Sequence, residues 1–446
     1  MTASNIAVIG SGISGLSATW LLSQSQNVTV FEKNDRLGGH ANTVMAKTAE
    51  GEVAVDTGFI VYNEVNYPNL TAFFDHLGVT TAPSWMSFAV SIAEGRREYS
   101  GEHLNGLFGQ RRNIIRPQHW QLVGDILRFF RQAEKQMATC TDELSIAQFL
   151  ERFGYSKIFI EDHILPISAA IWSTPSRGML DFPARTFIEF FANHSLLQVS
   201  NRPMWRTVTQ GAKQYVDAID RDKKFKTVLN ARIQTVVRHA TGVEIFMADG
   251  SRQHFDEVVF ACHADEALAL LADPSVEERN VLSSFRFSTN HAVLHTDKGF
   301  MPRRRHLWSS WNYLRGENGE GENGLSLTYW MNSLQPLPTK TNLFVTLNPH
   351  RDFAPGTVQY KVDYEHPLFD AQAITAQQDL WQIQGMQRSW FAGAWMGYGF
   401  HEDGLQAGLE VAERIGPMQR PWSVKDQRQR IAHNWVQGDQ TLWAAE

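Results

Sequence analysis

Short runs of apolar residues separated by a glycine-rich turn open the chain. Residues 5–9 (Asn-Ile-Ala-Val-Ile) are a run of branched apolar side chains typical of a buried parallel strand. The sequence Gly-Ser-Gly-Ile-Ser-Gly follows at 10–15, residues 16–24 have helical character, and a second apolar run at 28–31 ends at Glu32. The pattern predicts a strand, a glycine turn, a helix, a second strand and an acid, as in the first unit of a doubly wound α/β fold.

This arrangement suits a dinucleotide. Gly10 lets the strand turn tightly, Gly12 lets the backbone approach a pyrophosphate, and Gly15 packs the helix against the strand. The helix N-terminus presents unpaired N–H groups and the positive end of its dipole to the phosphates. Glu32 stands about 20 residues further on, where its carboxylate accepts hydrogen bonds from the ribose hydroxyls. The same carboxylate would repel a 2′-phosphate, which disfavours NADP.

A second glycine motif separates FAD from NAD. Arg36 and the pair Gly38-Gly39 come directly after the acid, and they allow a second close approach of the backbone near the ribityl-pyrophosphate end of a longer cofactor. Here the sequence resembles the flavin amine oxidase and phytoene desaturase superfamily, whose R-x-G-G motif follows the acid in this way. His40 stands where many members of that superfamily have arginine, which changes the expected contact to the cofactor.

The resemblance continues in the middle of the chain. Residues 225–262 alternate as short strands, the first at 227–233, with a turn at Asp249-Gly250. The resemblance implies that the main chain at Ile233 pairs with adenine. Residues 56–62 resemble the superfamily's next strand and turn, which pass close to the flavin, and an ordinary hairpin is the alternative.

A strand, turn and helix near the C-terminus complete the resemblance. Residues 390–405 precede a helical run to about Ile415, and in the superfamily the N-terminus of this helix faces the flavin pyrimidine carbonyl. A positive dipole end stabilises negative charge on reduced flavin. Asp403 belongs to this site or is a simple N-cap. Ala394-Trp395 replaces the superfamily's usual acid, which removes the acceptor of one ribityl hydrogen bond.

The resemblance implies an α/β fold of the amine oxidase type, with a discontinuous Rossmann-like FAD-binding domain and an α+β substrate domain. The FAD-binding segments are expected at 1–85, 205–275 and 385–415, and the substrate-domain segments at 86–204 and 276–384. The tail at 416–446 carries charges and three tryptophans. It is either a docked arm or partly mobile.

The composition excludes several classes of protein. The chain has 446 residues and a formal charge of −6. This mildly acidic composition does not indicate a protein that binds nucleic acid. Cys140 and Cys262 are its only cysteines, too few for a disulfide framework and suited to a reducing cytosol. His163 and His194 lack metal-ligand spacing, so no metal is predicted. Because no cysteine follows Cys262, we expect noncovalent FAD.

The chain shows no export signal, and no apolar stretch approaches the roughly 18 residues of a spanning helix. We therefore expect a cytoplasmic protein, with peripheral contact at the inner membrane as an open alternative. Residues 104–116 mix apolar side chains with three arginines, and Trp120 follows. That composition fits either an interfacial element or a solvated basic surface over a domain core.

A narrower resemblance covers nearly the whole chain. It rests on residues 163–173, 201–208, 302–305 with 311–313, and 399–404. These look like a bacterial family of NAD/FAD-binding oxidoreductases, whose members are similar to the methylated fatty-acyl desaturase of furan fatty acid synthesis. The resemblance implies a lipid acyl substrate.

The residue expected to act as a base lies on a strand at 287–294. In amine oxidases of the superfamily a lysine on this strand holds a water near flavin N5, and His291 stands at that position here. Histidine titrates near neutrality, so His291 is the candidate base, with a structural role as the alternative.

Three functions remain open. The first is an FAD-dependent oxidoreductase that dehydrogenates a long acyl chain by hydride transfer to N5. The second is amine oxidation, and the third is a non-catalytic FAD- or lipid-binding protein. The expected partner is a lipid or another apolar small molecule, and the oligomeric state is left open. The predicted cofactor-binding residues are Gly10, Gly12, Ser14, Gly15, Glu32, Lys33, Arg36, Gly38, Gly39, His40, Thr43, Gly58, Phe59, Ile233, Gly393, Gly399, Asp403, Gly404 and Leu405.

Overall fold

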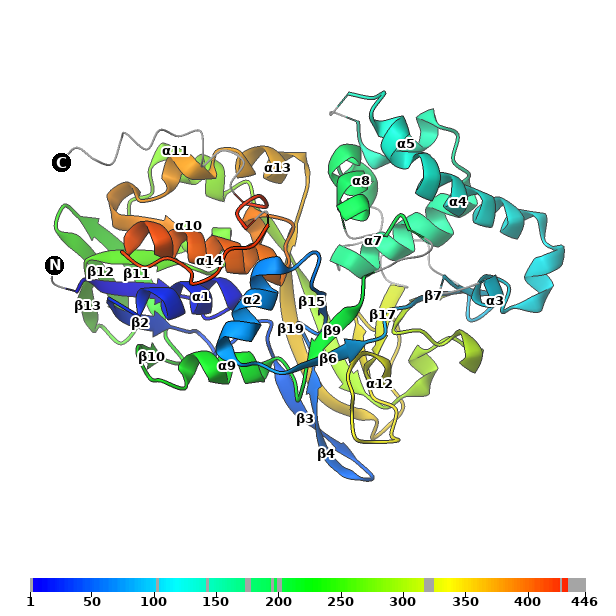
Figure 1. Cartoon of the computed structure of the whole chain (residues 1–446), viewed down its shortest axis with the longest axis horizontal. Helices are drawn as coiled ribbons and strands as arrows, with labels where there is room; N and C mark the ends of the chain where they lie inside the picture. Colours follow the sequence, from blue (N-terminus) through cyan, green and yellow to red (C-terminus); the bar gives the residue numbers. More distant parts are fainter. Residues whose placement is uncertain are drawn as a thin grey trace.

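The computed structural model of the chain describes residues 3–101, 104–141, 144–172, 178–193, 196–198, 203–316, 325–425 and 427–431. Two regions lie side by side in it (Figure 1). One is built around a parallel sheet that contains the N-terminal strand. The other is built around a larger mixed sheet, with a group of helices packed above it (Figure 1).

A five-stranded parallel sheet forms the centre of the first region, in the order β10-β2-β1-β14-β20. The strand bounds are β10 Lys226–Val228, β2 Asn27–Phe31, β1 Asn5–Ile9, β14 Glu257–Phe260 and β20 Ser389–Phe391. The strands predicted at 5–9 and 28–31 are β1 and β2. All but the first residue of each is buried, as expected of strands covered on both faces.

Helix α1 (Ile13–Leu22) connects β1 to β2 and begins one turn before the helix predicted at 16–24. Gly15 lies in that first turn, and a Cβ there would overlap the carbonyl oxygen of Gly10. A residue of low helix propensity is therefore required where the helix starts against the strand end. Because of that low propensity, the sequence pattern did not predict the first turn of the helix.

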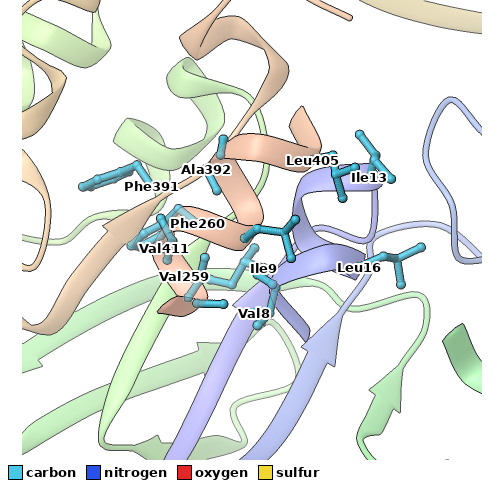
Figure 2. Close-up of a cluster of buried hydrophobic side chains, with 14 of the residues drawn as sticks. Val8, Ile9, Ile13, Leu16, Val259, Phe260, Phe391, Ala392, Leu405 and Val411 are labelled. Carbon is cyan, nitrogen blue, oxygen red and sulfur yellow. The ribbon is translucent and has the colours of Figure 1, made fainter. Parts of the chain in front are cut away.

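Segments far apart in the chain share one core in this region. Figure 2 shows the labelled side chains in contact at its centre: Val8, Ile9, Ile13, Leu16, Val259, Phe260, Phe391, Ala392, Leu405 and Val411. They come from β1, α1, β14, the end of β20 and α14 (His401–Ile415). The core also includes side chains of α2 (Pro68–Leu77), α9 (Lys213–Asp220), α10 (Ala264–Leu270), α11 (Val276–Leu282) and α13 (Ala371–Gln377). The last two helices come from a segment that the sequence had assigned to the substrate domain.

A three-stranded antiparallel sheet lies beside the parallel one and corrects one expected strand. Its strands are β11 Ile233–His239, β12 Gly242–Met247 and β13 Arg252–Phe255. The single strand expected at 227–233 is wrong, because β10 ends at Val228 and β11 begins at Ile233. Asn230 between them has a φ of 53°. This left-handed conformation breaks the strand, and asparagine is one of the few residues that tolerate it.

The second region contains a seven-stranded sheet in the order β19-β15-β18-β17-β16-β7-β8. Its strands are β19 Val358–Leu368, β15 Arg286–His295, β18 Phe344–Leu347, β17 Leu325–Trp330, β16 Trp311–Arg315, β7 Phe88–Ile92 and β8 Arg97–Ser100. The long strands β15 and β19 pair along their whole length and lie between the two regions (Figure 1). Smaller sheets join β3 Thr43–Thr48 to β4 Gly51–Asp56, and β5 Tyr62–Asn63 and β6 Thr81–Ser84 to β9 Trp205–Val208.

Helices cover one side of this sheet and enclose an aromatic core. Their bounds are α3 Leu104–Leu107, α4 Pro117–Met137, α5 Ile146–Arg152, α6 Lys157–Phe159, α7 Leu165–Trp172 and α8 Ala184–Asn193, with α12 Met331–Leu334 beside the sheet. Phe129, Phe159, Phe187 and Phe191 are fully buried among them. In the part of the chain that the structure describes, no helix is both long and apolar enough to cross a bilayer.

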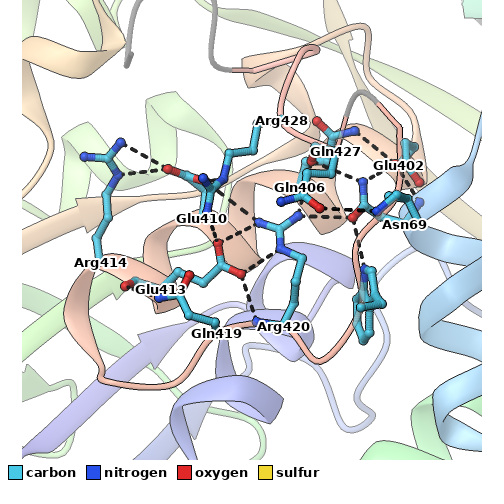
Figure 3. A network of polar contacts seen from close by, with 12 residues as sticks. Asn69, Glu402, Gln406, Glu410, Glu413, Arg414, Gln419, Arg420, Gln427 and Arg428 are labelled. Carbon is cyan, nitrogen blue, oxygen red and sulfur yellow. Dashed lines mark hydrogen bonds and ion pairs between the residues drawn. The ribbon is translucent and has the colours of Figure 1, made fainter. Parts of the chain in front are cut away.

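The beginning of the tail is docked, which settles one question that the sequence left open. Figure 3 shows Arg420, Gln427 and Arg428 against Glu410 and Glu413 of α14 and against Asn69 of α2. Residues 432–446 lie outside the described residues.

Candidate functional site

The glycine loop between β1 and α1 leaves room for a ligand. Gly10 has a φ of +102°, and a Cβ there would lie 2.5 Å from the carbonyl oxygen of Ala261. A Cβ on Gly12 would meet nothing within 4 Å. Gly12 is also the N-cap of α1 and has no side chain with which to cap the helix, so the first N–H groups of α1, including that of Ser14, can donate to an anion. The loop fits a pyrophosphate.

Glu32 lies at the end of β2 with its carboxylate buried and fixed. One oxygen accepts hydrogen bonds from the backbone N–H (3.0 Å) and the hydroxyl (2.6 Å) of Ser11, and the other accepts from the backbone N–H (2.9 Å) and the side-chain amide (2.8 Å) of Asn34. A carboxylate held in this way at the tip of the second strand fits a ribose diol. The main chain of Ala231 donates to the carbonyl of Glu32 at 2.8 Å, which brings the start of β11 at Ile233 next to this end.

The two glycine motifs touch each other. The backbone N–H of Gly38 donates to the carbonyl of Ser11 at 3.0 Å, and a Cβ on Gly39 would lie 3.0 Å from the Cα of Gly12. Arg36 donates to the carbonyl of Gly39 at 2.9 Å, so its guanidinium holds the turn. The predicted pyrophosphate loop and the R-x-G-G turn therefore form one continuous wall.

The turn at 57–59 extends this wall. The backbone N–H of Phe59 donates to the carbonyl of His40 at 2.8 Å, and a Cβ on Gly58 would overlap the same carbonyl. The Phe59 ring stacks on His401 with 3.7 Å between ring centroids. Residues predicted from three separate motifs thus meet at the start of α14.

His40 points into a group of polar rings. It stacks on Tyr364 (4.9 Å between centroids) and lies edge-on to His366 (5.2 Å), while its buried Nε2 has no hydrogen-bond partner among the described residues. Burial, followed by the charges of neighbouring histidines, holds the pKa of His40 well below its usual 6.5. An unpartnered polar atom in a buried position is what a bound cofactor would satisfy.

The strand β15 turns Asn290 toward this group and His291 away from it. The Asn290 amide hydrogen-bonds to His366 Nδ1 at 2.9 Å, and burial lowers the pKa of His366 to about 4. His291 Nδ1 lies 2.6 Å from a carboxylate oxygen of Asp363, and the two side chains are each about two-thirds exposed to solvent. Successive residues of a strand face opposite sides, so the two neighbours cannot both face the site. This placement argues against His291 as the base.

Two helix N-termini converge at the site. A Cβ on Gly404 would lie 2.7 Å from Ile13 and 2.8 Å from the Ser14 hydroxyl, so the first turns of α14 and α1 are in contact. The loop before α14 turns at Gly399, where φ is +91°. Both dipoles direct their positive ends to the same place, which stabilises phosphate and negative charge on a reduced ring.

Several predicted cofactor residues have structural partners instead. Asp403 is fully buried and accepts a hydrogen bond from the backbone N–H of Phe400 at 2.8 Å, so it caps α14. Leu405 lies in the core of Figure 2. Thr43 donates to Asp56 at 2.5 Å, and Lys33 is exposed and pairs with Glu266 at 2.5 Å.

The loop that starts at Gly393 differs from the superfamily pattern for a steric reason. A Cβ on Gly393 would overlap the Trp395 indole, whose N–H donates to the carbonyl of Cys262 at 3.1 Å. Trp395 is buried against Phe285. The tryptophan thus fills the space with an apolar ring where the superfamily has an acid.

One group of side chains in the described residues has the geometry of a metal site, which the sequence did not predict. His263, Glu266 and Glu365 place ligand atoms within 4.8 Å of one another. The Lys33 ammonium already supplies a positive charge to Glu266. We assign no metal to this group.

Sequence reasoning missed the residues that support the site from a distance. Ser11 was visible inside the glycine motif, and its hydroxyl could have been paired with Glu32. Tyr364, His366 and Asn290 carried no signal, because their positions depend on the pairing of β15 with β19.

Comparisons with known proteins identify the family and the fold. A family model described as flavin-containing amine oxidoreductase matches residues 13–416. A protein named probable polyamine oxidase 4, from Arabidopsis thaliana, is 31% identical over 147 residues, which cover 32% of this chain and 28% of that protein. The chain thus spans little more than a quarter of that relative's length.

Two solved structures share the fold. The structure of a CLA-producing fatty acid isomerase from P. acnes matches with a TM-score of 0.63 and 15% identity, over 92% of this chain and 98% of that one. A putative protoporphyrinogen oxidase from Exiguobacterium sp. 255-15 matches with a TM-score of 0.65 and 13% identity, over 93% and 99%. At this identity the matches establish the α/β fold.

Proposed function

The chain belongs to the family of flavin-containing amine oxidoreductases and is an FAD-dependent oxidoreductase, and from this premise we propose that it dehydrogenates a long fatty acyl chain, methyl-branched and carried on a phospholipid. Amine oxidation is the runner-up, because the relative from Arabidopsis thaliana is named as a polyamine oxidase.

An aromatic wall that leads to the start of α14 carries the proposal. Trp172 at the end of α7 packs on Phe190 of α8 with 4.6 Å between ring centroids. Phe190 stacks in turn on Phe400 at 5.3 Å and meets Tyr398 edge-on at 5.9 Å. This largely buried group of rings therefore runs from the helical core to the residue before α14, and an acyl chain is the substrate that suits such apolar surroundings.

The charges beside the wall favour an acyl chain over an amine. A protonated amine needs a carboxylate or another polar acceptor. The carboxylate of Asp403 accepts a hydrogen bond from the backbone N–H of Phe400, and its other oxygen lies 3.4 Å from the guanidinium of Arg430. Glu189 on α8 is exposed and lies 3.9 Å from Arg185. Among the described residues, these two carboxylates beside the wall thus have partners already.

The residues of the chain then have defined tasks. When bound, FAD would supply the hydride acceptor. The N-termini of α1 and α14 would hold the cofactor, and the aromatic wall would exclude water and orient the C–H bond that reacts. Asn290 fixes the ring of His366, which is neutral at pH 7 because of its lowered pKa.

The substrate is tested by anaerobic bleaching of the flavin. A methyl-branched unsaturated acyl chain in phospholipid is expected to bleach it, and mono- and polyamines are not. Phe190→Leu should slow the bleaching about tenfold at unchanged FAD content, because it replaces one aromatic ring of the wall with a smaller side chain. Phe149→Leu is the matched control, since Phe149 lies in the same core against Phe153 and Tyr155. Bleaching by an amine without response to any acyl lipid would overturn the proposal in favour of amine oxidation.

A second pair of variants uses neighbours on β15. Asn290→Ala should slow bleaching by about tenfold or more, because the ring of His366 loses its hydrogen bond. His291→Ala should leave the rate and the FAD content unchanged. A large loss in His291→Ala alone would restore that histidine as the base.

A further inference from the structure

A basic and apolar surface lies at the end of the molecule farthest from the parallel sheet, where α3 and the start of α4 are found (Figure 1). It is formed by the loop after β7, by the turn at Arg111–Ile115, by the first turn of α4 and by residues 303–305. Its arginines are Arg96, Arg111, Arg112, Arg116, Arg303, Arg304 and Arg305.

Among the described residues, most of these arginines are not paired with a carboxylate. Arg303 pairs with Glu94 at 2.7 Å and Arg304 with Glu98 at 2.5 Å. Within the described residues, Arg96, Arg111, Arg112 and Arg116 form no ion pair with a carboxylate. Arg96, Arg112, Arg303 and Arg304 line an open hollow of about 580 Å³. The whole chain carries a charge of −6, so this concentration of arginines runs against the composition of the protein.

Large apolar side chains project from the same surface. Ile115 is 83% exposed, Trp120 53% and Ile114 47%. The Trp120 indole donates to the carbonyl of Ile114 at 2.8 Å and packs on Phe108 at 4.8 Å between centroids. The tryptophan is thus held in place with about half of its surface in water, and the turn is held by Arg112 and Arg116, which donate to the carbonyl of Arg96.

From this juxtaposition we propose that the surface docks the protein onto an anionic phospholipid bilayer. The arginines meet the headgroup phosphates, and Ile114, Ile115 and Trp120 enter the boundary between headgroups and acyl chains. Phosphate favours guanidinium as a partner, and tryptophan favours the bilayer interface. A folded nucleic acid would use the charge but would leave the two isoleucines in water.

The proposal is independent of the substrate and is tested with the FAD-loaded protein and vesicles. Binding is measured by flotation with phosphatidylcholine vesicles that do or do not contain about 30% phosphatidylglycerol. We expect binding only to the anionic vesicles, and a marked loss as salt is raised from about 0.1 M to about 0.5 M.

Two variants separate the charged part from the apolar part. Arg96→Gln/Arg111→Gln/Arg112→Gln should weaken binding by about a hundredfold, since each basic residue contributes about fivefold. Ile115→Ser should weaken binding by about tenfold and leave its salt dependence intact. Lys213→Gln/Lys223→Gln/Lys224→Gln, which removes three exposed lysines of the other region, is the charge-matched control and should bind as the wild type does.

Equal binding of the wild type to both kinds of vesicle, or unchanged binding in both variants, would overturn the proposal. So would tighter binding to RNA than to anionic vesicles. Flavin bleaching by an acyl substrate offered in neutral detergent should be the same in all variants. That assay reports on the proposed function, so a failure of docking and a failure of the substrate assignment are distinguishable.

Discussion

The two sides of α14 are buried by opposite means. On the side toward α1, Gly404 and Gly408 let the helix come close, and apolar side chains such as Leu405 and Val411 fill the core (Figure 2). On the side toward the tail, Glu410 and Glu413 are buried against Arg420 and other arginines (Figure 3). The side toward α1 is stabilised by close packing, and the side toward the tail is held by buried ion pairs.

The difference shows how the position of α14 is controlled. A close-packed side tolerates no added atom, because a backbone in contact cannot move without separating the elements. A buried ionic side contributes little net stability, yet it is sensitive to the loss of any one partner, because the remaining charge stays buried. The tail after α14 is therefore part of the structure that orients the helix.

The largest effect is expected at Gly408. A Cβ there would overlap the carbonyl oxygen of Ser14 and the hydroxyl of Ser17. Gly408→Leu should cost more than about 5 kcal/mol and abolish folding. Gly416→Leu is the control, because a Cβ at Gly416 would only make ordinary contact at 3.4 Å. Soluble yield and bound FAD report the outcome, and a folded, yellow Gly408→Leu protein would contradict close packing.

The next effect is expected at Arg420 on the ionic side. It donates to Glu413 at 2.7 and 3.0 Å and to Asn69 at 3.1 Å, and it is buried. Arg420→Met should cost about 3–5 kcal/mol in urea unfolding, because Glu413 is left buried. Arg414→Met removes a more exposed arginine from Glu410 and should cost less than about 1 kcal/mol.

A double variant sharpens this contrast. Arg420→Met/Glu413→Met should recover most of the stability lost in Arg420→Met, since no charge remains uncompensated between them. Equal stability of the single and the double variant would show that the arginine acts through packing alone.

A smaller effect is expected at Glu402, which links α14 to α2. Its fully buried carboxylate accepts from the backbone N–H groups of Asn69 (3.1 Å) and Leu70 (2.9 Å) at the start of α2. Glu402→Gln should cost about 1.5–3 kcal/mol in urea unfolding, because an amide turns a donor toward these N–H groups. The control is Glu277→Gln, an exposed acid in the first turn of α11, and a similar loss in both would contradict the assignment.

The smallest effect is a dependence of stability on pH. Burial lowers the pKa of His401, beside Phe59, to about 3. Unfolded histidine titrates near 6.5, so the unfolded chain binds more protons and stability falls as the pH drops below about 6.5. Burial tends to raise the pKa of Glu413, but its hydrogen bonds and Coulombic attraction to Arg420 outweigh that tendency and lower the pKa below 4.5. Its contribution is present above about 4.5 and is lost as the pH falls through the folded pKa.

The two pH limbs are assigned by variants. Each group contributes at most about 1.4 kcal/mol per pH unit to the free energy of unfolding. His401→Gln should reduce the slope of the fall between about pH 6.5 and 4.5, to which His40 and His366 also contribute, and Arg420→Met should reduce the slope of the fall below about 4.5. Identical pH profiles in wild type and both variants would contradict the assignment.

Much of the candidate cofactor site could be proposed from the sequence because its signals are local. The glycines of 10–15, the acid at Glu32 and the turn at Arg36 act through backbone conformation and short spacing, which the sequence displays directly. The sequence therefore predicted the parallel strands β1 and β2 and the family. It misplaced the start of α1 because glycine has a low helix propensity, although Gly15 lies inside the helix. It also predicted one strand at 227–233, because nothing in the local sequence showed that Asn230 interrupts it.

What the sequence determined by itself is the order of the elements that bind the dinucleotide, since each motif folds from residues that are neighbours in the chain. The tertiary structure alone decided that Asn290 faces His366 while His291 faces solvent, that Glu402 caps a helix more than 300 residues away, and that the tail closes over α14. These features depend on which surfaces meet when distant segments pack. A side chain's partner across such a contact is set by burial and register, which no local pattern encodes.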